Sequence, residues 1–215
     1  MRVFLVFFVL FPFFLFAQER TIFEDEFKKS FHTKPKLDVK FDNRFSFIRD
    51  NDVKTVGVKV GLSFNRKFKV GLGINQMLLP VEKKILNEEN VLVLVDLEYF
   101  YFSPYIEYVY YNSKRWEFSL STQFGFGSAS YQFSNSNGKK NKLVESTVLS
   151  YEPAMLIDYK IIRWVGIGTG IGYRLIYYKS LGVQENFSSP EYVLKLKIYL
   201  GEIVRTITGK DLEID

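Results

Sequence analysis

The sequence predicts an all-β fold, an up-and-down barrel of eight antiparallel strands that spans a membrane. Three observations predict it. Apolar and polar residues alternate with a period of two through most of the chain after residue 36. The polar side of this alternation is rich in glycine, serine and charges of both signs. Aromatic residues make up 18% of the 215 residues, and many of them lie at strand ends beside short turns.

Composition excludes several other classes of protein. Mean hydropathy is only −0.03, and no segment after the N-terminal one approaches 18 consecutive apolar residues, which excludes a bundle of membrane helices. The absence of cysteine excludes disulfides, thiol nucleophiles, cysteine metal sites and the acylated anchor of a lipoprotein. The 29 Lys and Arg residues are interspersed with 24 Asp and Glu residues, so no nucleic-acid partner is expected.

Residues 1–17 are predicted to be a cleaved signal peptide. Arg2 is followed by an apolar run over residues 3–17, and the polar Gln18 comes next. The run is shorter than the roughly 20 residues of a spanning helix, although an uncleaved anchor is the alternative.

Residues 18–36 are predicted to form a periplasmic leader. Phe23, Phe27 and Phe31 recur every fourth residue, which places their rings on one face of a short amphipathic helix. Such a helix would lie on the inner leaflet or cover the barrel mouth. Because a helix this short is marginal alone, a disordered leader is the alternative.

The barrel itself is expected over residues 37–205, followed by a periplasmic tail over 206–215. In residues 55–64, Val58 and Val60 belong to a face of large apolar residues, whereas Gly57, Lys59 and Gly61 belong to a small or polar face. The eight segments with this alternation are 37–47, 55–64, 68–75, 91–111, 116–127, 149–159, 165–175 and 191–201.

The segment 91–111 departs from the simple pattern. Asp96 and Glu98 fall on the side that is apolar from Phe100 onward. Two explanations are open: a β-bulge near Leu97, or a part of the strand that projects above the bilayer. Pro104 on the apolar side indicates a further local irregularity.

The small and polar face is predicted to line the lumen, with the apolar face against lipid. Eight strands leave an interior that side chains just fill, and charges confined there must be paired. A soluble barrel with the opposite facing is the alternative. The residues assigned to a structural charge network in the lumen are Asp38, Lys40, Asp42, Arg44, Lys59, Lys69, Glu107, Glu117, Glu152, Asp158, Arg174, Lys195 and Lys197.

Aromatic residues and connection lengths predict the orientation. Three short turns alternate with longer connections over 79–90, 134–146 and 180–190, as expected for periplasmic turns and external loops. The aromatic residues assigned to a girdle at the membrane interface are Phe64, Phe68, Tyr110, Trp116, Tyr159 and Trp164.

These features resemble the small outer-membrane protein β-barrel family, similar to the eight-stranded barrels of outer membrane proteins A and X. The likeness rests on the alternating strands, the glycine-rich segment Gly166–Tyr173 and two turn segments, Phe-Asn-Arg-Lys-Phe and Tyr-Tyr-Asn-Ser-Lys-Arg-Trp. It implies location in the outer membrane of a Gram-negative bacterium, with the bilayer and the outer-membrane assembly machinery as partners. Such barrels often end on an aromatic residue, whereas this chain continues past Tyr199.

The chemistry-bearing residues do not form a recognisable catalytic set. A serine nucleophile needs a base, and the single histidine, His32, precedes the first strand. Glu107, Glu117 and Glu152 could act as acid and base, but are better explained by lumen ion pairs. The acidic loop over residues 82–89 lacks the fixed spacing of a calcium loop, so neither a metal nor a cofactor is expected.

The predicted function is therefore that of a non-enzymatic outer-membrane barrel that contributes to envelope structure or binds a partner through its surface loops. The first alternative is a small porin-like pore or transport accessory. A lipid A-modifying enzyme and a soluble ligand-binding barrel are the remaining alternatives.

Overall fold

The computed structural model describes residues 24–48, 51–78, 81–86, 92–134, 140–183 and 185–208. The expected signal peptide over residues 1–17, Phe23 of the leader and the end of the tail lie outside the described residues.

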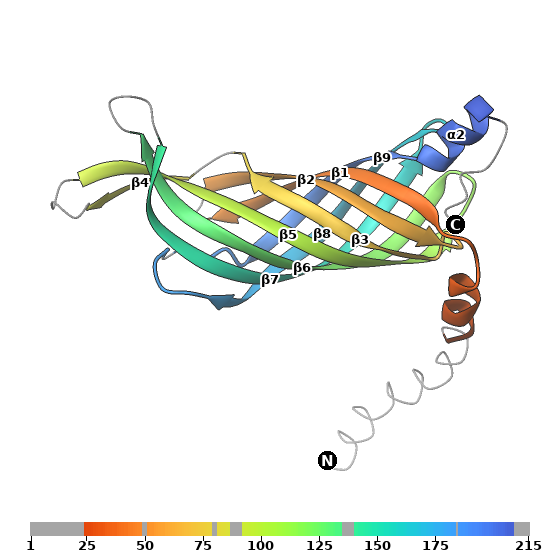
Figure 1. The fold of residues 1–215 in the computed structure, drawn as a ribbon, viewed down its shortest axis with the longest axis horizontal. Helices are drawn as coiled ribbons and strands as arrows, with labels where there is room; N and C mark the ends of the chain where they lie inside the picture. Colours follow the sequence, from red (N-terminus) through yellow and green to blue (C-terminus); the bar gives the residue numbers. More distant parts are fainter. Residues whose placement is uncertain are drawn as a thin grey trace, which may run out of the picture.

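Eight antiparallel strands form a closed ring, which confirms the predicted fold class (Figure 1). Neighbours along the chain pair with one another around the ring. The pairing of β1 with β9 closes the ring, and β3 pairs directly with β5. The ring strands are β1 (Lys36–Ile48), β2 (Asn51–Phe64), β3 (Phe68–Met77), β5 (Leu92–Asn112), β6 (Trp116–Ser134), β7 (Lys140–Lys160), β8 (Val165–Lys179) and β9 (Ser189–Ile198).

The predicted alternation sets the facing of the strands. On β2, Val58 and Val60 are 46% and 48% exposed on the outer surface, whereas Lys59 between them is only 5% exposed inside the ring. Successive side chains of a strand point to opposite faces, so a period of two separates the two environments. The ring therefore has an apolar outer surface and a polar interior over this part of β2.

A ninth strand lies where a loop was expected. Residues 79–90 include β4 (Val81–Leu86), which pairs with residues Leu92–Leu97 of β5 and takes over the edge of β5 beyond the end of β3. The expected loop 134–146 is also shorter, because β7 begins at Lys140 and pairs with β6 up to Ser134. Much of the length assigned to external loops is thus a sheet of β4, β5, β6 and β7 that extends past the other strands (Figure 1).

At the irregularity predicted in β5, the strand keeps the same inward and outward positions, but polar residues occupy the outward positions and apolar residues the inward ones. The register of β5 with β6 is continuous from Asp96 to Phe102, so the bulge expected near Leu97 is not there; a shift occurs between Val109 and Tyr111. Leu97 is 1% exposed inside the ring, and the outward positions carry Asp96 and Glu98. β6 inverts at the same level, because outward Phe126 is followed on that face by Ser128 and Gln132.

Two helical segments lie at the end of the ring that carries the short turns (Figure 1). Residues 24–31 are helical, as the phenylalanine spacing predicts. The last strand ends at Ile198, and α2 (Leu200–Thr208) follows it, so the barrel ends before the expected residue 205. Among the described residues, no helix is both long enough and apolar enough to cross a membrane.

Candidate functional site

The interior nearest the short turns holds a cluster of ion pairs, here called the lower cluster. Glu107 of β5 contacts Lys40 at 2.7 Å and Lys69 at 2.9 Å. Glu117 of β6 contacts Lys69 and, at 2.7 Å, Lys197. These side chains come from five different strands, so the cluster joins the walls of the ring. Its members are Asp38, Lys40, Lys69, Glu107, Glu117, Asp158, Lys195 and Lys197.

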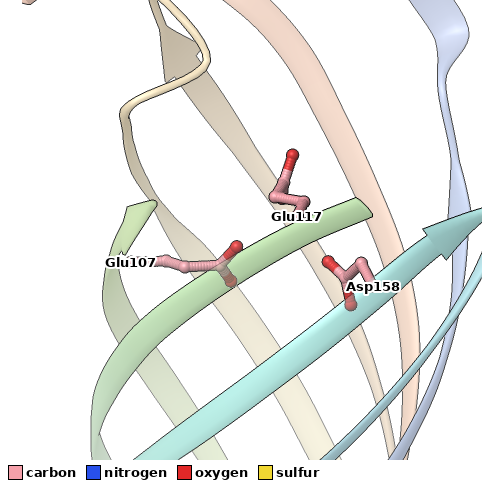
Figure 2. A group of neighbouring side chains, drawn as sticks. All are labelled: Glu107, Glu117 and Asp158. Atoms are coloured by element: carbon pink, nitrogen blue, oxygen red, sulfur yellow. The ribbon is translucent and has the colours of Figure 1, made fainter. Parts of the chain in front are cut away.

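Three carboxylates of the lower cluster lie close enough to be considered as a metal site. Glu107, Glu117 and Asp158 project into one region from neighbouring strands, with one oxygen of each within 4.8 Å of the others (Figure 2). Each of them already contacts two lysines, as Asp158 does with Lys195 at 2.8 Å and Lys197 at 3.5 Å. The ammonium groups supply the positive charge that a cation would bring, so the donor set does not fit a divalent ion.

Higher in the interior lies a second network, here called the upper cluster. Arg44 of β1 contacts Glu191 at 2.6 Å and Glu152 at 3.2 Å, and Arg174 of β8 contacts the same two carboxylates at 2.5 Å and 2.9 Å. Its members are Asp42, Arg44, Lys59, Glu152, Arg174 and Glu191.

All thirteen predicted lumen residues thus lie buried inside the ring, but they form two clusters rather than one. The three glutamates considered as acid and base are not together, because Glu107 and Glu117 belong to the lower cluster and Glu152 to the upper. Glu191 was not among the assigned residues. Glu191 lies an even number of residues before Lys195 and Lys197 on β9 and therefore shares their inward face, which could have identified it from the sequence. With Glu191 included, acidic and basic side chains of the two clusters are equal in number, as burial in a confined space requires.

Tyr105 fills the space between the two clusters. Its ring centroid lies 5.0 Å from Nζ of Lys40 in the lower cluster and 5.5 Å from Nζ of Lys59 in the upper one. Glycines make room for it: a Cβ added at Gly61 would lie 2.5 Å from the Tyr105 hydroxyl, and one at Gly71 would lie 2.8 Å from the ring. The glycine-rich inner face therefore accommodates large side chains that cross the lumen.

The far end of the interior is apolar and is closed by the connection between β8 and β9. Phe187 is fully buried and packs against Tyr99, with ring centroids 5.2 Å apart. The Val183 backbone N–H donates to Ser146 Oγ at 2.7 Å, and the Tyr131 hydroxyl donates to the Glu185 carboxylate. The segment expected to be an external loop over 180–190 is thus folded into the mouth of the ring. The buried apolar residues at this end are Val53, Met77, Val95, Leu97, Tyr99, Tyr101, Ala129, Tyr131, Val148, Val183 and Phe187.

The predicted aromatic girdle divides into exposed and covered members. Tyr110, Trp116 and Trp164 are 44%, 46% and 41% exposed on the outer surface at the short-turn end. Tyr159 is half-buried and packs on Trp116 at a centroid distance of 4.7 Å. Phe64 is also half-buried, and Phe68 is only 3% exposed.

Phe64 and Phe68 are covered by the leader helix rather than left open. The Phe31 ring stacks on Phe64 at 4.5 Å, and Phe27 meets Phe68 edge-on at 5.1 Å. The Tyr108 hydroxyl donates to the Glu26 carboxylate at 3.1 Å, so a polar contact also holds the helix against the wall. The helix therefore lies against the outside of the barrel wall, and of the two placements left open by the sequence the one over the barrel mouth is wrong.

His32 is exposed just after this helix. Its Nδ1 donates to the carbonyl of Lys28 at 2.7 Å. The only histidine of the chain thus lies outside the ring, away from the serines of the interior.

Comparisons of the sequence found no matching family profile and no matching curated protein. Comparison of the structure found similarity to Neisserial surface protein A, with a TM-score of 0.53 at 10% identity over 76% of this chain and 95% of that one. Ail of Yersinia pestis, solved with the heparin analogue sucrose octasulfate, gives 0.48 at 13% identity over 77% of this chain and 99% of that one. The chain has the fold of the small outer-membrane β-barrels.

Proposed function

We propose that the protein is a non-enzymatic integral outer-membrane barrel that contributes to envelope structure and presents the sheet of β4, β5, β6 and β7 to a partner outside the cell. The observation that carries the proposal is the inversion of polarity along β5 and β6. A protein in one solvent keeps one kind of residue outside along a whole strand, whereas a strand that leaves a bilayer exchanges its apolar outer face for a polar one.

The length of the apolar outer face supports a bilayer as its solvent. On β5 this face runs from Tyr110 at the girdle to Phe100, just below Glu98. Ten residues rise about 33 Å along a strand, and a tilt of about 40° reduces this to about 25 Å along the membrane normal. That height equals the apolar band of about 25 Å in outer-membrane barrels.

The change of the outer face from apolar to polar also indicates which end of the barrel faces outward. The end with the short turns, the girdle and the leader helix would face the periplasm, and the extended sheet would face outward. The outer face of this extension carries Asp96, Glu98 and Gln132 beside the exposed apolar residue Leu94, and this mainly polar face suits contact with water or a polar partner.

The filled interior argues against the alternative of a pore. Both clusters cross the lumen, and Tyr105 occupies the space between them. The mouth above is closed by the segment that includes Phe187. A conducting path would have to break several buried ion pairs, each of which leaves an uncompensated charge.

The position of His32 argues against the lipid-modifying alternative. A serine nucleophile needs a base within hydrogen-bond distance, and His32 lies outside the ring beside Lys28. The carboxylates of the two clusters are engaged by lysines and arginines and are not free to act as the base.

Membrane fractionation of the native chain tests the proposal. We expect the protein in the outer-membrane fraction, extracted only by detergent and migrating differently on gels before and after heating. N-terminal sequencing of the mature chain reads the signal cleavage site, and depletion of the outer-membrane assembly machinery should lower its amount. A freely soluble, detergent-free monomer would refute the proposal.

A further inference from the structure

The mouth of the barrel at the short-turn end encloses a small cavity with a marked excess of positive charge. The cavity has a volume of about 90 Å³. A single water needs only about 10–15 Å³ on this measure, so there is room for several waters or one small oxyanion. The lining comes from the start of β1, from the β2–β3, β5–β6 and β7–β8 connections and from α2.

The floor of the cavity is electrically balanced. Lys69 and Lys197 both contact Glu117, and Lys197 also lies 4.0 Å from Asp38. Tyr199 adds no negative charge, since a phenol is neutral near pH 7, and burial, with Glu117 and Asp158 nearby, raises the pKa of its hydroxyl further above the ordinary value. The excess of positive charge therefore belongs to the rim.

The rim has one acidic residue for five basic ones. Glu202 of α2 lies 3.2 Å from Arg66 and 3.9 Å from Lys160. Arg115 donates to the hydroxyl of Tyr159 at 2.9 Å. The basic residues that surround the cavity are Lys36, Arg66, Lys114, Arg115 and Lys160.

The backbone at Arg66 is a second observation at the same place. Asn65 and Arg66 have φ angles of 49° and 56°, and the Lys67 N–H donates to the Phe64 carbonyl at 2.9 Å, as in a type I′ turn. Glycine is favoured at the position of Arg66, and a bulky residue there is strained. The turn thus places a guanidinium on the rim at a cost in backbone energy, which is typical of functional positions.

We propose that this mouth binds a phosphate group, free or as the headgroup of an anionic phospholipid, between the five basic residues of the rim. Guanidinium and ammonium groups donate strong, charge-assisted hydrogen bonds to phosphate oxygens. The site is independent of any partner of the extended sheet at the other end, so it goes beyond the proposed function.

Binding is tested with the full mature chain refolded in vesicles of zwitterionic phosphatidylcholine, with inorganic phosphate as the probe and ³¹P NMR as the readout. Lys114→Gln combined with Arg115→Gln should weaken phosphate binding about tenfold or more, since each removes a charged donor. Glu202→Gln should tighten binding several-fold, because it frees Arg66 and Lys160, and misfolding would not produce such a gain. Raising the salt concentration should weaken binding.

Lys142→Gln is the matched control for each single change, Lys114→Gln or Arg115→Gln, because it removes one positive charge at the other end of β7, where Lys142 is exposed. It should leave binding unchanged. Vesicles with added phosphatidylglycerol distinguish the source: competition with inorganic phosphate assigns the site to a lipid headgroup, and absence of competition assigns it to a free anion. Undetectable binding of both probes, or equal weakening by Lys142→Gln, would overturn the proposal, while heat-modifiable migration reports separately that the barrel is folded.

Discussion

Arg44 and Glu191 lie 2.6 Å apart on β1 and β9, the two strands whose pairing closes the ring. Arg174 contacts the other oxygen of Glu191 at 2.5 Å, so one carboxylate bridges two guanidinium groups. All three side chains are at most 2% exposed. The closure of the barrel therefore depends on an acidic residue that links β1, β8 and β9.

Replacement of this carboxylate should destabilise the barrel. We expect Glu191→Gln to lower the free energy of unfolding by about 3 kcal/mol, the lower end for removal of one buried partner, because Glu152 still contacts both arginines. Urea unfolding in phospholipid vesicles, followed by tryptophan fluorescence, measures the change. Glu145→Gln is the control, because the exposed pair of Glu145 and Lys142 should contribute less than about 1 kcal/mol. Equal effects of the two changes would contradict a structural role for the upper cluster.

The boundary of the lipid-facing belt can be tested at two equally exposed positions. Val60 is 48% exposed and Leu94 is 53% exposed, but Leu94 lies on β5 beyond the inversion of polarity. Val60→Arg should cost roughly 2–4 kcal/mol if it lies deep in the bilayer, whereas Leu94→Arg should cost less than about 1 kcal/mol. Folding yield into vesicles compares the two. If both positions accept arginine equally, the outer face of β2 does not meet lipid.

Close packing against an inner-face glycine gives a third prediction. A Cβ at Gly127 would lie 2.1 Å from the Phe100 carbonyl oxygen and 2.4 Å from the Tyr101 Cβ. Because backbone atoms do not move aside easily, Gly127→Ala should destabilise the barrel by about 1–3 kcal/mol. At Gly166 the nearest atoms would be 3.1 Å away, so Gly166→Ala should cost less in the same unfolding measurement. The reverse order would show that the strands adjust around Gly127.

The leader helix should depend on its contact with the barrel wall. Phe31→Ala removes the ring stacked on Phe64, and such aromatic pairs contribute about 0.5–1.5 kcal/mol beyond their buried area. We expect faster cleavage by trypsin at Lys28 and Lys29 in vesicle-bound protein, read by mass spectrometry. Leu181→Ala, at a fully exposed side chain far from the helix, should leave cleavage unchanged. Unchanged cleavage in Phe31→Ala would mean that the contacts of Phe27 and Glu26 hold the helix without the Phe31 ring.

Replacement of the segment that covers the mouth opposite the short turns should not open a pore. Replacement of residues 181–187 by a glycine-serine linker exposes the apolar end of the interior, but both clusters remain below it. Planar-bilayer recordings should therefore stay at the background conductance. A steady current from this variant would favour the pore alternative.

The parts of the fold that face two unlike environments were predictable from sequence. The alternation of β2, with Val58 and Val60 against Lys59, gave its facing directly, and the same rule placed the charged residues of β1 and β9 inside. β4 was missed because its sequence Val-Glu-Lys-Lys-Ile-Leu does not alternate. The structure of β4 is determined by its pairing with β5 rather than by a contrast between two environments on its two faces.

The division of the lumen charges into two clusters was not predictable, because it depends on the register between strands. Glu117 on β6 and Glu152 on β7 both point inward, yet they belong to different clusters. The register explains this, because Glu117 lies opposite Asp158, whereas Glu152 lies opposite Gln123. Parity states which face a side chain occupies, and only register states its height. Parity also does not show what packs on a face, so Phe68 was assigned to the girdle although the helix over residues 24–31 covers it.

The ring closure through Glu191 has a consequence for biogenesis. Arg44 is made 147 residues before its partner, so any nascent or truncated chain that lacks β9 carries an arginine without that counter-ion on its inner face. An open sheet in hydrocarbon would also expose the unpaired backbone edges of β1 and β8. Insertion one hairpin at a time would leave Arg44 and these backbone edges without their partners in hydrocarbon, so the structure favours insertion together with closure, after synthesis of the last strand.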